Sequence, residues 1–247
     1  MKLGKIVQSI SQNIGSAANI EITGIAYDSR AVKPGYLFIA IRGFETDGHK
    51  YIQNAIENGA AAVIGESDAA CDCPYIKCED SRRAMALAAA EFYGHPERRL
   101  KIIGITGTNG KTTTTYLIKQ ILNLKGERCD LIGTNHIIVG EDVRESIHTT
   151  PESLDLFRLF SEMAESGGKY VLMEVSSHSL ALERVYGIEF ETAVITNITQ
   201  DHLDFHKTMA AYAAAKAKLF TMSKTAAVNA DDSYKDVILK AAKGPVI

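Results

Sequence analysis

The stretch KIIGITGTNGKTTTTYLIKQIL, residues 101–122, decides the fold that we expect for this chain. An apolar, isoleucine-rich run leads into a Gly/Thr/Asn turn, which is followed by a lysine, four threonines and a helical pattern of apolar residues. A glycine-rich turn between a strand and a helix is typical of phosphate-binding loops, because backbone N–H groups converge there and the helix N-terminus carries partial positive charge. The loop residues are Gly107, Thr108, Asn109, Gly110, Lys111, Thr112 and Thr113.

This loop departs from the strict G-x₄-G-K-[ST] pattern, which requires glycine where the chain has Ile105. An ordinary glycine-rich turn with an exposed lysine is the alternative interpretation, and the flanking strand and helix favour the phosphate site. In such a site Lys111 reaches the β- and γ-phosphates of a nucleoside triphosphate, and the Thr112 hydroxyl coordinates Mg²⁺.

Strands and helices alternate through the rest of this region. Strands are expected at 100–106, 129–134, 170–176, 192–199 and 226–230, and helices at 111–126, 150–168 and 208–220. Pro151 is expected in the first turn of the helix over 150–168. Such alternation predicts a mostly parallel sheet with helices on both faces.

The region before the loop has its own set of elements. Strands are expected at 21–30, 35–43, 61–66 and 74–79, and helices at 48–60 and 81–94, the second with Ser81 as its N-cap. A charged, proline-containing linker follows at 94–100. The fold class is therefore α/β, with a small N-terminal α/β domain over 1–97 and a loop-containing parallel-sheet domain over 98–247. Because the last residues, AAKGPVI, read as the start of another strand, we expect a fragment or shortened relative of a longer protein.

Composition sets outer limits. Of 247 residues, 46% are hydrophobic and 23% are charged, as in ordinary soluble globular proteins. The net charge of −3 indicates no overall electrostatic attraction to nucleic acid or to an anionic membrane. The sequence lacks an apolar run of about 18 residues and a signal peptide, and we expect a cytoplasmic monomer without a membrane span. Cys71, Cys73 and Cys78 lack the second ligand pair of a zinc site, so we expect them and Cys129 to be reduced thiols.

Polar groups follow two of the expected strands. Glu174 ends one, with Ser176, Ser177 and His178 after it, and the other is followed by Asn197, Asp201, His202, Asp204 and His206. Ligand oxygens in parallel sheets lie at such carboxyl ends. Glu174 could instead be a buried carboxylate paired with lysine, but an unpaired charge in so apolar a strand is costly and a cation is favoured. The His202–His206 spacing alone also occurs by chance, and the glutamate of the zinc motif H-E-x-x-H is absent.

Five segments together resemble the Mur ligases. They are GITGTNGKTT at 104–113, HTTPESLDL at 148–156, MEVSSHSLALERV at 173–185, TNITQDHLDFHKTMAAYAAAKAKLF at 196–220 and DSRAVKPGYLFIAIRGFETDGHKYI at 28–52. The resemblance spans nearly the whole chain. Within the family, the TTP and MEVSSH segments favour the branch that adds the third amino acid to UDP-N-acetylmuramoyl-L-alanyl-D-glutamate over the branch that adds D-Ala-D-Ala.

The resemblance implies an ATP-dependent amide-bond ligase of peptidoglycan precursor synthesis. ATP phosphorylates the D-glutamyl carboxylate, and the amine of the incoming amino acid then displaces phosphate from the acyl phosphate. We favour meso-diaminopimelate over L-lysine as the amino acid because it is commoner among bacteria. Its site would lie mostly outside this chain.

The resemblance also implies roles for single residues. ATP phosphates lie on Gly107 to Thr113, with Lys111 and Lys216 as catalytic residues. Mg²⁺ is held by Thr112, Glu174, His202 and Lys216, the lysine in carbamate form. The UDP-muramoyl substrate contacts Ser29, Phe44, Glu45, Thr46, Thr149, Thr150, Ser176 and Arg184. Lys216 could equally be a solvated helix lysine like Lys218, and the hydroxyl residues could be ordinary strand-end and cap residues.

Other functions stay open at this stage. Relatives carry a C-terminal domain that is absent here, so we expect binding of UDP-sugar and nucleotide without efficient ligation. The chain could instead be a non-catalytic UDP-muramoyl-peptide or nucleotide-binding module derived from a ligase. A P-loop NTPase or kinase is a third possibility, although it leaves the DSR and TTP segments without a role.

Overall fold

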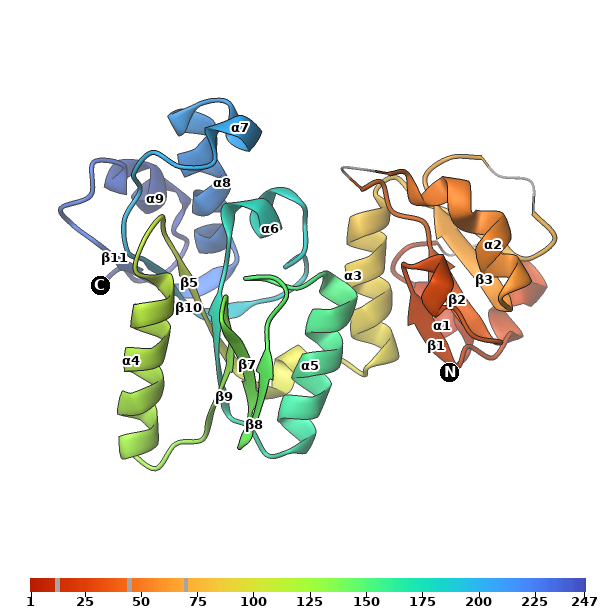
Figure 1. Cartoon of the computed structure of the whole chain (residues 1–247), viewed down its shortest axis with the longest axis horizontal. Coiled ribbons are helices and arrows are strands. Elements are labelled where there is room, and N and C mark those ends of the chain that lie inside the picture. Colours follow the sequence, from red (N-terminus) through yellow and green to blue (C-terminus); the bar gives the residue numbers. More distant parts are fainter. Residues whose placement is uncertain (12–13, 44–45, 69–70) are drawn as a thin grey trace. The chain divides into compact units, whose positions relative to one another are not determined.

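The computed structural model describes residues 1–11, 14–43, 46–68 and 71–247. These residues form two compact units, Met1–His95 and Pro96–Ile247 (Figure 1). The predicted α/β fold class, a small first domain followed by a larger and mostly parallel sheet, is confirmed. No helix in the described ranges is long and apolar enough to cross a lipid bilayer.

The first unit is built around a small parallel sheet. Its elements are α1 (Leu3–Val7), η1 (Gly15–Asn19), β1 (Gly24–Ala26), η2 (Ser29–Ala31), β2 (Tyr36–Ile39), η3 (Gly48–Tyr51), α2 (Ile52–Glu57), β3 (Ala60–Gly65), β4 (Tyr75–Lys77) and α3 (Ser81–Phe92). The described strands pair in the order β1-β2-β3-β4, and each neighbouring pair is parallel. Phe38 and Val63 from the sheet pack with Ile52 and Ala55 from α2. Because β2 and β3 run in the same direction, their carboxyl ends and the turns that follow them lie at one edge of the sheet.

The N-cap predicted for α3 is wrong by one residue. Asp80, not Ser81, caps this helix, because its carboxylate accepts the N–H groups of Arg82 and Arg83 at 2.9 and 3.0 Å. Ser81 is the first helical residue, and its N–H and hydroxyl both donate to Glu66. Both residue types cap helices well, so the choice depends on the tertiary contact with Glu66.

The second unit contains the predicted strand–loop–helix stretch. Its elements are η4 (Pro96–Arg99), β5 (Lys101–Thr106), α4 (Lys111–Leu124), β6 (Cys129–Ile132), β7 (His136–Val139), β8 (Asp142–Glu145), α5 (Ser153–Glu165), β9 (Tyr170–Glu174), α6 (Ser177–Ala181), β10 (Phe190–Ile195), α7 (Leu203–His206), α8 (Met209–Thr221), β11 (Ser223–Val228) and α9 (Lys235–Ala241).

The larger sheet places β5 between β10 and β9. The strand order is β11-β10-β5-β9-β6-β7-β8, parallel from β11 to β6. Ile105 packs with Ile118 and Leu122 of α4, whereas a side chain at Gly104 would meet Leu219 of α8. Since successive strand residues face opposite ways, α4 and α8 cover opposite faces. Figure 1 shows α4 and α5 likewise on either side of the strands. The carboxyl ends of β5, β6, β9 and β10 therefore open onto one edge, where ligands bind in such sheets.

Several elements and one helix start differ from the sequence prediction. The hairpin β7–β8 was not expected: β8 is exposed along its whole length, so it lacks the alternation of a half-buried strand. Helix α9 was also not expected. Pro151 does not lie in the first helical turn, because α5 begins at Ser153 with Glu152 as its N-cap. Pro151 thus precedes the helix, directly after the bend that carries Thr149 and Thr150.

Candidate functional site

The phosphate loop joins the end of β5 to the start of α4. Two of its glycines have backbone angles that favour glycine: φ is +147° at Gly107 and +84° at Gly110, which is the N-cap of α4. A Cβ at Gly107 would collide with the Thr196 hydroxyl at the end of β10. At the helix start, the N–H groups of Lys111, Thr112 and Thr113 have no intrahelical acceptor, so they are available to an anion.

The residues after β10 hold this loop in place. The side chain of Asn197 brackets Asn109, accepting its N–H at 3.1 Å and donating to its carbonyl at 3.0 Å. Thr196 donates to the same carbonyl at 2.6 Å. Thr108 donates its N–H to Asn197 O at 2.8 Å. The cradle is thus fixed from two strands, which reduces the reorganisation needed to bind an anion.

Two lysines lie against the loop. Lys111 Nζ donates to the carbonyl oxygens of Gly107 and Thr108, both at 3.0 Å, and Lys216 Nζ donates to Gly107 O at 2.9 Å. Lys216 is only 1% exposed, so the alternative of a solvated helix lysine like Lys218 is wrong. Burial, and next the charge on Lys111, lower the pKa of Lys216 to about 7. Burial also lowers the pKa of Lys111, while the charges of Glu174 and Asp201 oppose that shift.

Glu174 is the centre of the site. Its side chain is fully buried at the end of β9, and its oxygens accept the Thr112 hydroxyl at 2.9 and 3.0 Å. The Thr134 N–H donates to Oε1 and the Thr134 hydroxyl to Oε2, both at 3.0 Å. Hydrogen bonds, and no ion pair among the described residues, hold this carboxylate, so the predicted alternative of a lysine salt bridge does not describe it. The Thr112 and Glu174 oxygens are hard donors side by side at the loop, and they suit Mg²⁺.

His202 lies in a different setting. It begins α7 with φ of +51°, its N–H donates to Asp201 at 2.9 Å, and its ring is 4.7 Å from that of His178. His206, largely buried, also lies beside His178, with 5.6 Å between ring centres. Burial lowers the pKa of His178 and of His206. Within the described residues, no three His, Cys, Asp or Glu side chains lie close enough to hold a metal ion together, so the metal role of His202 stays a prediction.

The segment before α5 contacts the end of β9, the strand that carries Glu174. Thr150 donates its hydroxyl to Glu174 O at 2.9 Å and accepts the Ser176 N–H at 3.1 Å. Ser176 caps α6 by accepting the Ser179 N–H. Arg184 Nη1 donates to Thr150 O at 3.0 Å, and its Nε lies 2.9 Å from Glu152. The structure thus brings together Thr150, Ser176 and Arg184 with Thr149 beside them, and their substrate contacts stay a prediction.

A separate cavity of about 520 Å³ lies in the first unit. Ser29 and Thr46 both line it, with Tyr27, Phe38, Tyr51 and Asn54. Phe44 and Glu45, the other predicted substrate contacts here, lie outside the described residues. The cavity offers aromatic faces and polar side chains, the lining typical of small-ligand sites.

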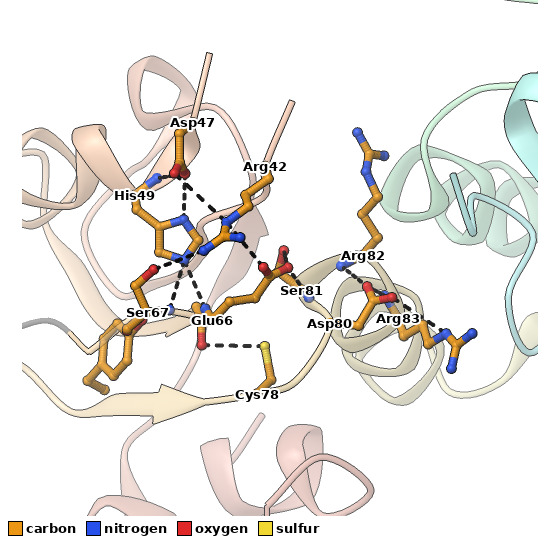
Figure 2. A network of polar contacts seen from close by, with 12 residues as sticks. Arg42, Asp47, His49, Glu66, Ser67, Cys78, Asp80, Ser81, Arg82 and Arg83 are labelled. Carbon is orange, nitrogen blue, oxygen red and sulfur yellow. Dashed lines mark hydrogen bonds and ion pairs between the residues drawn. The ribbon is translucent and has the colours of Figure 1, made fainter. Parts of the chain in front are cut away.

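One wall of this cavity is held by the polar network in Figure 2. The His49 ring accepts the Glu66 N–H on Nε2 at 2.8 Å, so its proton is on Nδ1 and is donated to Asp47 at 2.6 Å. These bonds from His49 hold the pKa of the Asp47 carboxyl below its usual value. Arg42 Nε lies 3.3 Å from Glu66. The turn that supplies Thr46 and Tyr51 to the cavity is therefore tied to the end of β3.

Sequence reasoning missed Thr134 and the loop-holding role of Thr196. Both follow the carboxyl ends of parallel strands, β6 and β10, at the edge where Glu174 and the phosphate loop also lie. That shared edge was the available signal, since ligand-facing residues in such sheets come from several strand ends. The three clustered cysteines, by contrast, are free thiols, with 4.0 Å between the Cys71 and Cys73 sulfurs.

Comparison with known families identifies both units. A model described as "Mur ligase middle domain" matches residues 105–247, and one described as "Mur ligase family, catalytic domain" matches residues 21–93. Among curated proteins, the chain is 49% identical to a UDP-N-acetylmuramoyl-L-alanyl-D-glutamate–2,6-diaminopimelate ligase of Caldanaerobacter subterraneus, covering 100% of the chain and 52% of that protein. The protein of the same name from Listeria monocytogenes is 46% identical, again covering 100% of the chain and 52% of the relative. The chain thus spans about half the length of the curated relatives it matches.

Solved structures agree. A structure of a UDP-N-acetylmuramoyl-L-alanyl-D-glutamate–2,6-diaminopimelate ligase matches with a TM-score of 0.85 and 29% identity, over 100% of this chain and 52% of the other. The MurF ligase of Thermotoga maritima in complex with ADP matches with a TM-score of 0.60 and 22% identity, over 92% of this chain and 49% of the other. At that identity the second match supports the fold alone.

Proposed function

Because this chain belongs to the Mur ligase family, we propose that it supplies the nucleotide-binding and UDP-muramoyl-binding parts of an ATP-dependent ligase. The ligase would add meso-diaminopimelate to UDP-N-acetylmuramoyl-L-alanyl-D-glutamate, the reaction named for the relatives at 46–49% identity. The observation that carries the proposal is the buried Glu174 carboxylate, which faces Thr112 at the first turn of the phosphate-loop helix.

The chemistry requires an activated carboxyl group. A carboxylate resists attack by an amine because oxide is a poor leaving group. In the proposed reaction an oxygen of the D-glutamyl carboxylate bonds to the γ-phosphorus of ATP and ADP leaves. The amine then bonds to the acyl carbon, phosphate leaves, and the amine gives up a proton. The protein must hold both substrates in line and offset the negative charge that gathers on the transferred group.

The residues of the loop suit that task. The free N–H groups of Lys111, Thr112 and Thr113 would bind phosphate oxygens, and Lys111 can leave the carbonyls of Gly107 and Thr108 to pair with the β- and γ-phosphates. Thr112 and Glu174 would hold Mg²⁺, with His202 as a further ligand. When bound, the metal would neutralise charge on the phosphates and help to align them.

Lys216 suits conversion to a carbamate. A lysine reacts with CO₂ only as the neutral amine, and a pKa of about 7 leaves much of Lys216 neutral at cellular pH. The product would place a negative charge near Gly107 and Lys111, where it could bind a second Mg²⁺. Its neighbour Lys218, about half exposed, would not share this role.

Each unit carries residues that we predict to contact the substrate. In the first unit, the cavity lined by Ser29 and Thr46 has a size and lining suited to the uridine end. In the second unit, Thr149, Thr150, Ser176 and Arg184 lie beside Glu174 and would meet the muramoyl-peptide end, where the carboxylate to be phosphorylated must approach the nucleotide.

Titration calorimetry of ADP in the presence of Mg²⁺ tests the nucleotide site. We expect binding by the wild-type chain and a loss of at least about tenfold in affinity for Lys111→Met, because a phosphate-pairing cation is removed. Lys119→Met is the matched control: Lys119 is on the same helix, but its amine donates to Cys129 O. If wild type and Lys111→Met bind ADP equally, or neither binds, the proposal is wrong.

Two further measurements address the substrates. Calorimetry with UDP-N-acetylmuramoyl-L-alanyl-D-glutamate separates a Mur-type site, which binds it, from an unrelated P-loop NTPase, which does not. Phosphate release with that substrate, ATP and diaminopimelate tests our prediction that this 247-residue chain turns over slowly. Rapid turnover would contradict it.

A further inference from the structure

We propose that Thr134 is a positioning residue that links the substrate-side threonine Thr149 to the metal-binding carboxylate of Glu174. The inference deepens the proposed function and rests on it. Thr134 lies in the turn between β6 and β7, after the carboxyl end of β6. It has no other evident purpose in the packing, because the residue is exposed whereas Glu174 is fully buried.

Thr134 grips both oxygens of the carboxylate. Its N–H donates to Oε1 and its hydroxyl to Oε2, each at 3.0 Å. The turn is packed closely against the same group, since a Cβ at Gly133 would lie 2.5 Å from Oε1. A carboxylate held at both oxygens cannot rotate about its terminal bond, so the orientation of its remaining lone pairs is fixed. In this orientation both oxygens lie next to the Thr112 hydroxyl, the other oxygen ligand proposed for the metal.

The Thr134 hydroxyl has two acceptors within reach. It donates toward Glu174 Oε2 at 3.0 Å and toward Thr149 Oγ1 at 3.1 Å, yet it has only one hydrogen to donate. Bonds to ionised acceptors are stronger than bonds between neutral groups, so a carboxylate at Glu174 is the preferred acceptor. Thr149 competes with Glu174 for the same hydrogen, and the contacts run from Thr149 through Thr134 to Glu174.

These contacts connect the two halves of the site. A substrate group that occupies Thr149 Oγ1 removes the competing acceptor, so the Thr134 hydrogen stays on Glu174. A second connection runs in parallel, because the adjacent Thr150 donates to Glu174 O at 2.9 Å. Occupation of the substrate segment and affinity for the metal should therefore be coupled, and coupling of binding free energies is reciprocal.

The test measures Mg²⁺ binding rather than turnover. ADP binding by the full 247-residue chain is titrated at increasing Mg²⁺, and the Mg²⁺ concentration that gives half of the maximal effect is recorded. Thr134→Val removes the hydroxyl with little change in shape and should raise that concentration at least about tenfold, as loss of an outer-shell partner commonly does. Thr134→Ser restores a hydroxyl and should stay within about twofold of wild type. Thermal unfolding of each variant verifies the fold, and the exposed position makes a folding defect unexpected.

The coupling is measured by repeating the titration with saturating UDP-N-acetylmuramoyl-L-alanyl-D-glutamate. We expect the substrate to lower the wild-type Mg²⁺ midpoint about fivefold or more, a usual size for coupling between sites, and to have no such effect in Thr134→Val or Thr149→Val. If the wild type responds to Mg²⁺ and folded Thr134→Val matches it, the inference is wrong while the proposed nucleotide site stands. If the wild type binds ADP without any response to Mg²⁺, the proposed metal site and this inference both fail.

Discussion

The Nζ atom of Lys216 lies 2.9 Å from the carbonyl oxygen of Gly107 and 4.6 Å from the centre of the Tyr212 ring. Both are uncharged partners for a side chain that is almost completely buried. Burial of an amine without a carboxylate in contact favours its neutral form. This arrangement would suit the carbamate proposed for Lys216, because a lysine must lose its proton before it reacts with CO₂, and it should have a measurable cost in stability.

Replacing Lys216 with methionine should stabilise the chain at pH 7. The folded pKa of about 7 is below the ordinary lysine value of 10.5, so the unfolded state binds more protons between these two pH values. The free energy of unfolding of the wild type therefore rises with pH across that window. In Lys216→Met this rise should be absent, and stability at pH 7 should increase by about 2–4 kcal/mol, an order-of-magnitude figure from the size of the shift.

Urea unfolding in CO₂-free buffer at several pH values provides the measurement. The control is Lys218→Met, whose stability should stay within about 0.5 kcal/mol of wild type because the side chain is half exposed. Parallel pH profiles for wild type and Lys216→Met would show that Lys216 is not buried as a neutral amine.

Gly107→Ala should damage both stability and nucleotide binding. The new methyl group would collide with the Thr196 hydroxyl, and φ of +147° is strained for any L side chain. We expect a loss of about 3 kcal/mol or more in the free energy of unfolding, above the 1–3 kcal/mol usual for backbone strain alone, together with loss of ADP binding. Gly126→Ala separates the two causes, since that glycine has φ of +77° but no neighbouring atom within 4 Å of a Cβ. It should lose only about 1 kcal/mol and bind ADP normally; equal damage at both positions would exclude the collision.

His49→Leu should weaken the first unit and its cavity. The substitution leaves the Asp47 carboxylate and the Glu66 N–H without the ring that joins them (Figure 2). We expect a loss of about 1 kcal/mol in stability, the low end of the usual cost of unpaired polar groups because the Asp47 side chain is 37% exposed, and weaker binding of UDP. His49→Gln has a donor and an acceptor and should recover part of both. Urea unfolding measures the change in stability, and calorimetry measures the binding of UDP. Unchanged UDP binding in a destabilised His49→Leu variant would show that the polar network does not support the cavity.

Asp130→Asn should flatten the pH dependence of stability in mildly acidic solution. Asp130 is fully buried on β6, its Oδ1 accepts the Gly140 N–H at 2.7 Å, and burial raises the pKa of its carboxyl. Since the folded pKa exceeds the unfolded value, this group's contribution is greatest below about pH 4 and is lost as pH rises through the folded pKa. Asparagine keeps the acceptor for Gly140 and has no charge to bury. Urea unfolding between pH 4 and pH 7 should show a smaller decline with pH than in wild type, and a steeper decline would contradict the assignment.

The sequence predicted the elements whose signals are local. The run before Gly107, the two glycines of the loop and the alanine-rich helix around Lys216 each carry a strong pattern of their own. Elements without a buried face were missed, as β8 shows, because an exposed edge strand has no alternation to detect. The cap of α3 was assigned to Ser81 instead of Asp80 because the deciding contact is with Glu66, which is distant in sequence.

The sequence was sufficient to predict the type of site, but not the contacts that its side chains make. A strand-end glutamate next to a phosphate loop was recognisable, and the structure places Glu174 against Thr112. The burial of Lys216 was not recognisable, because Lys216 and Lys218 stand two residues apart in the same alanine-rich helix. Only packing against Gly107 and Tyr212 distinguishes them. Thr134 was missed although it follows a strand that ends at the same edge as Glu174, because that position indicates a ligand-facing residue without naming its carboxylate partner forty residues away.

The strand order of the larger sheet has a consequence for how the chain matures on the ribosome. β5 emerges early, yet both of its neighbours, β9 and β10, are made some seventy to ninety residues later. Until Ile195 has been synthesised, the isoleucines of β5 have no partner strand on one side, and Asn197 cannot yet fasten the loop. Such delayed, long-range pairing slows folding and leaves apolar strand edges uncovered, so the nascent segment from Lys101 to Ile195 is where chaperone binding during translation should concentrate.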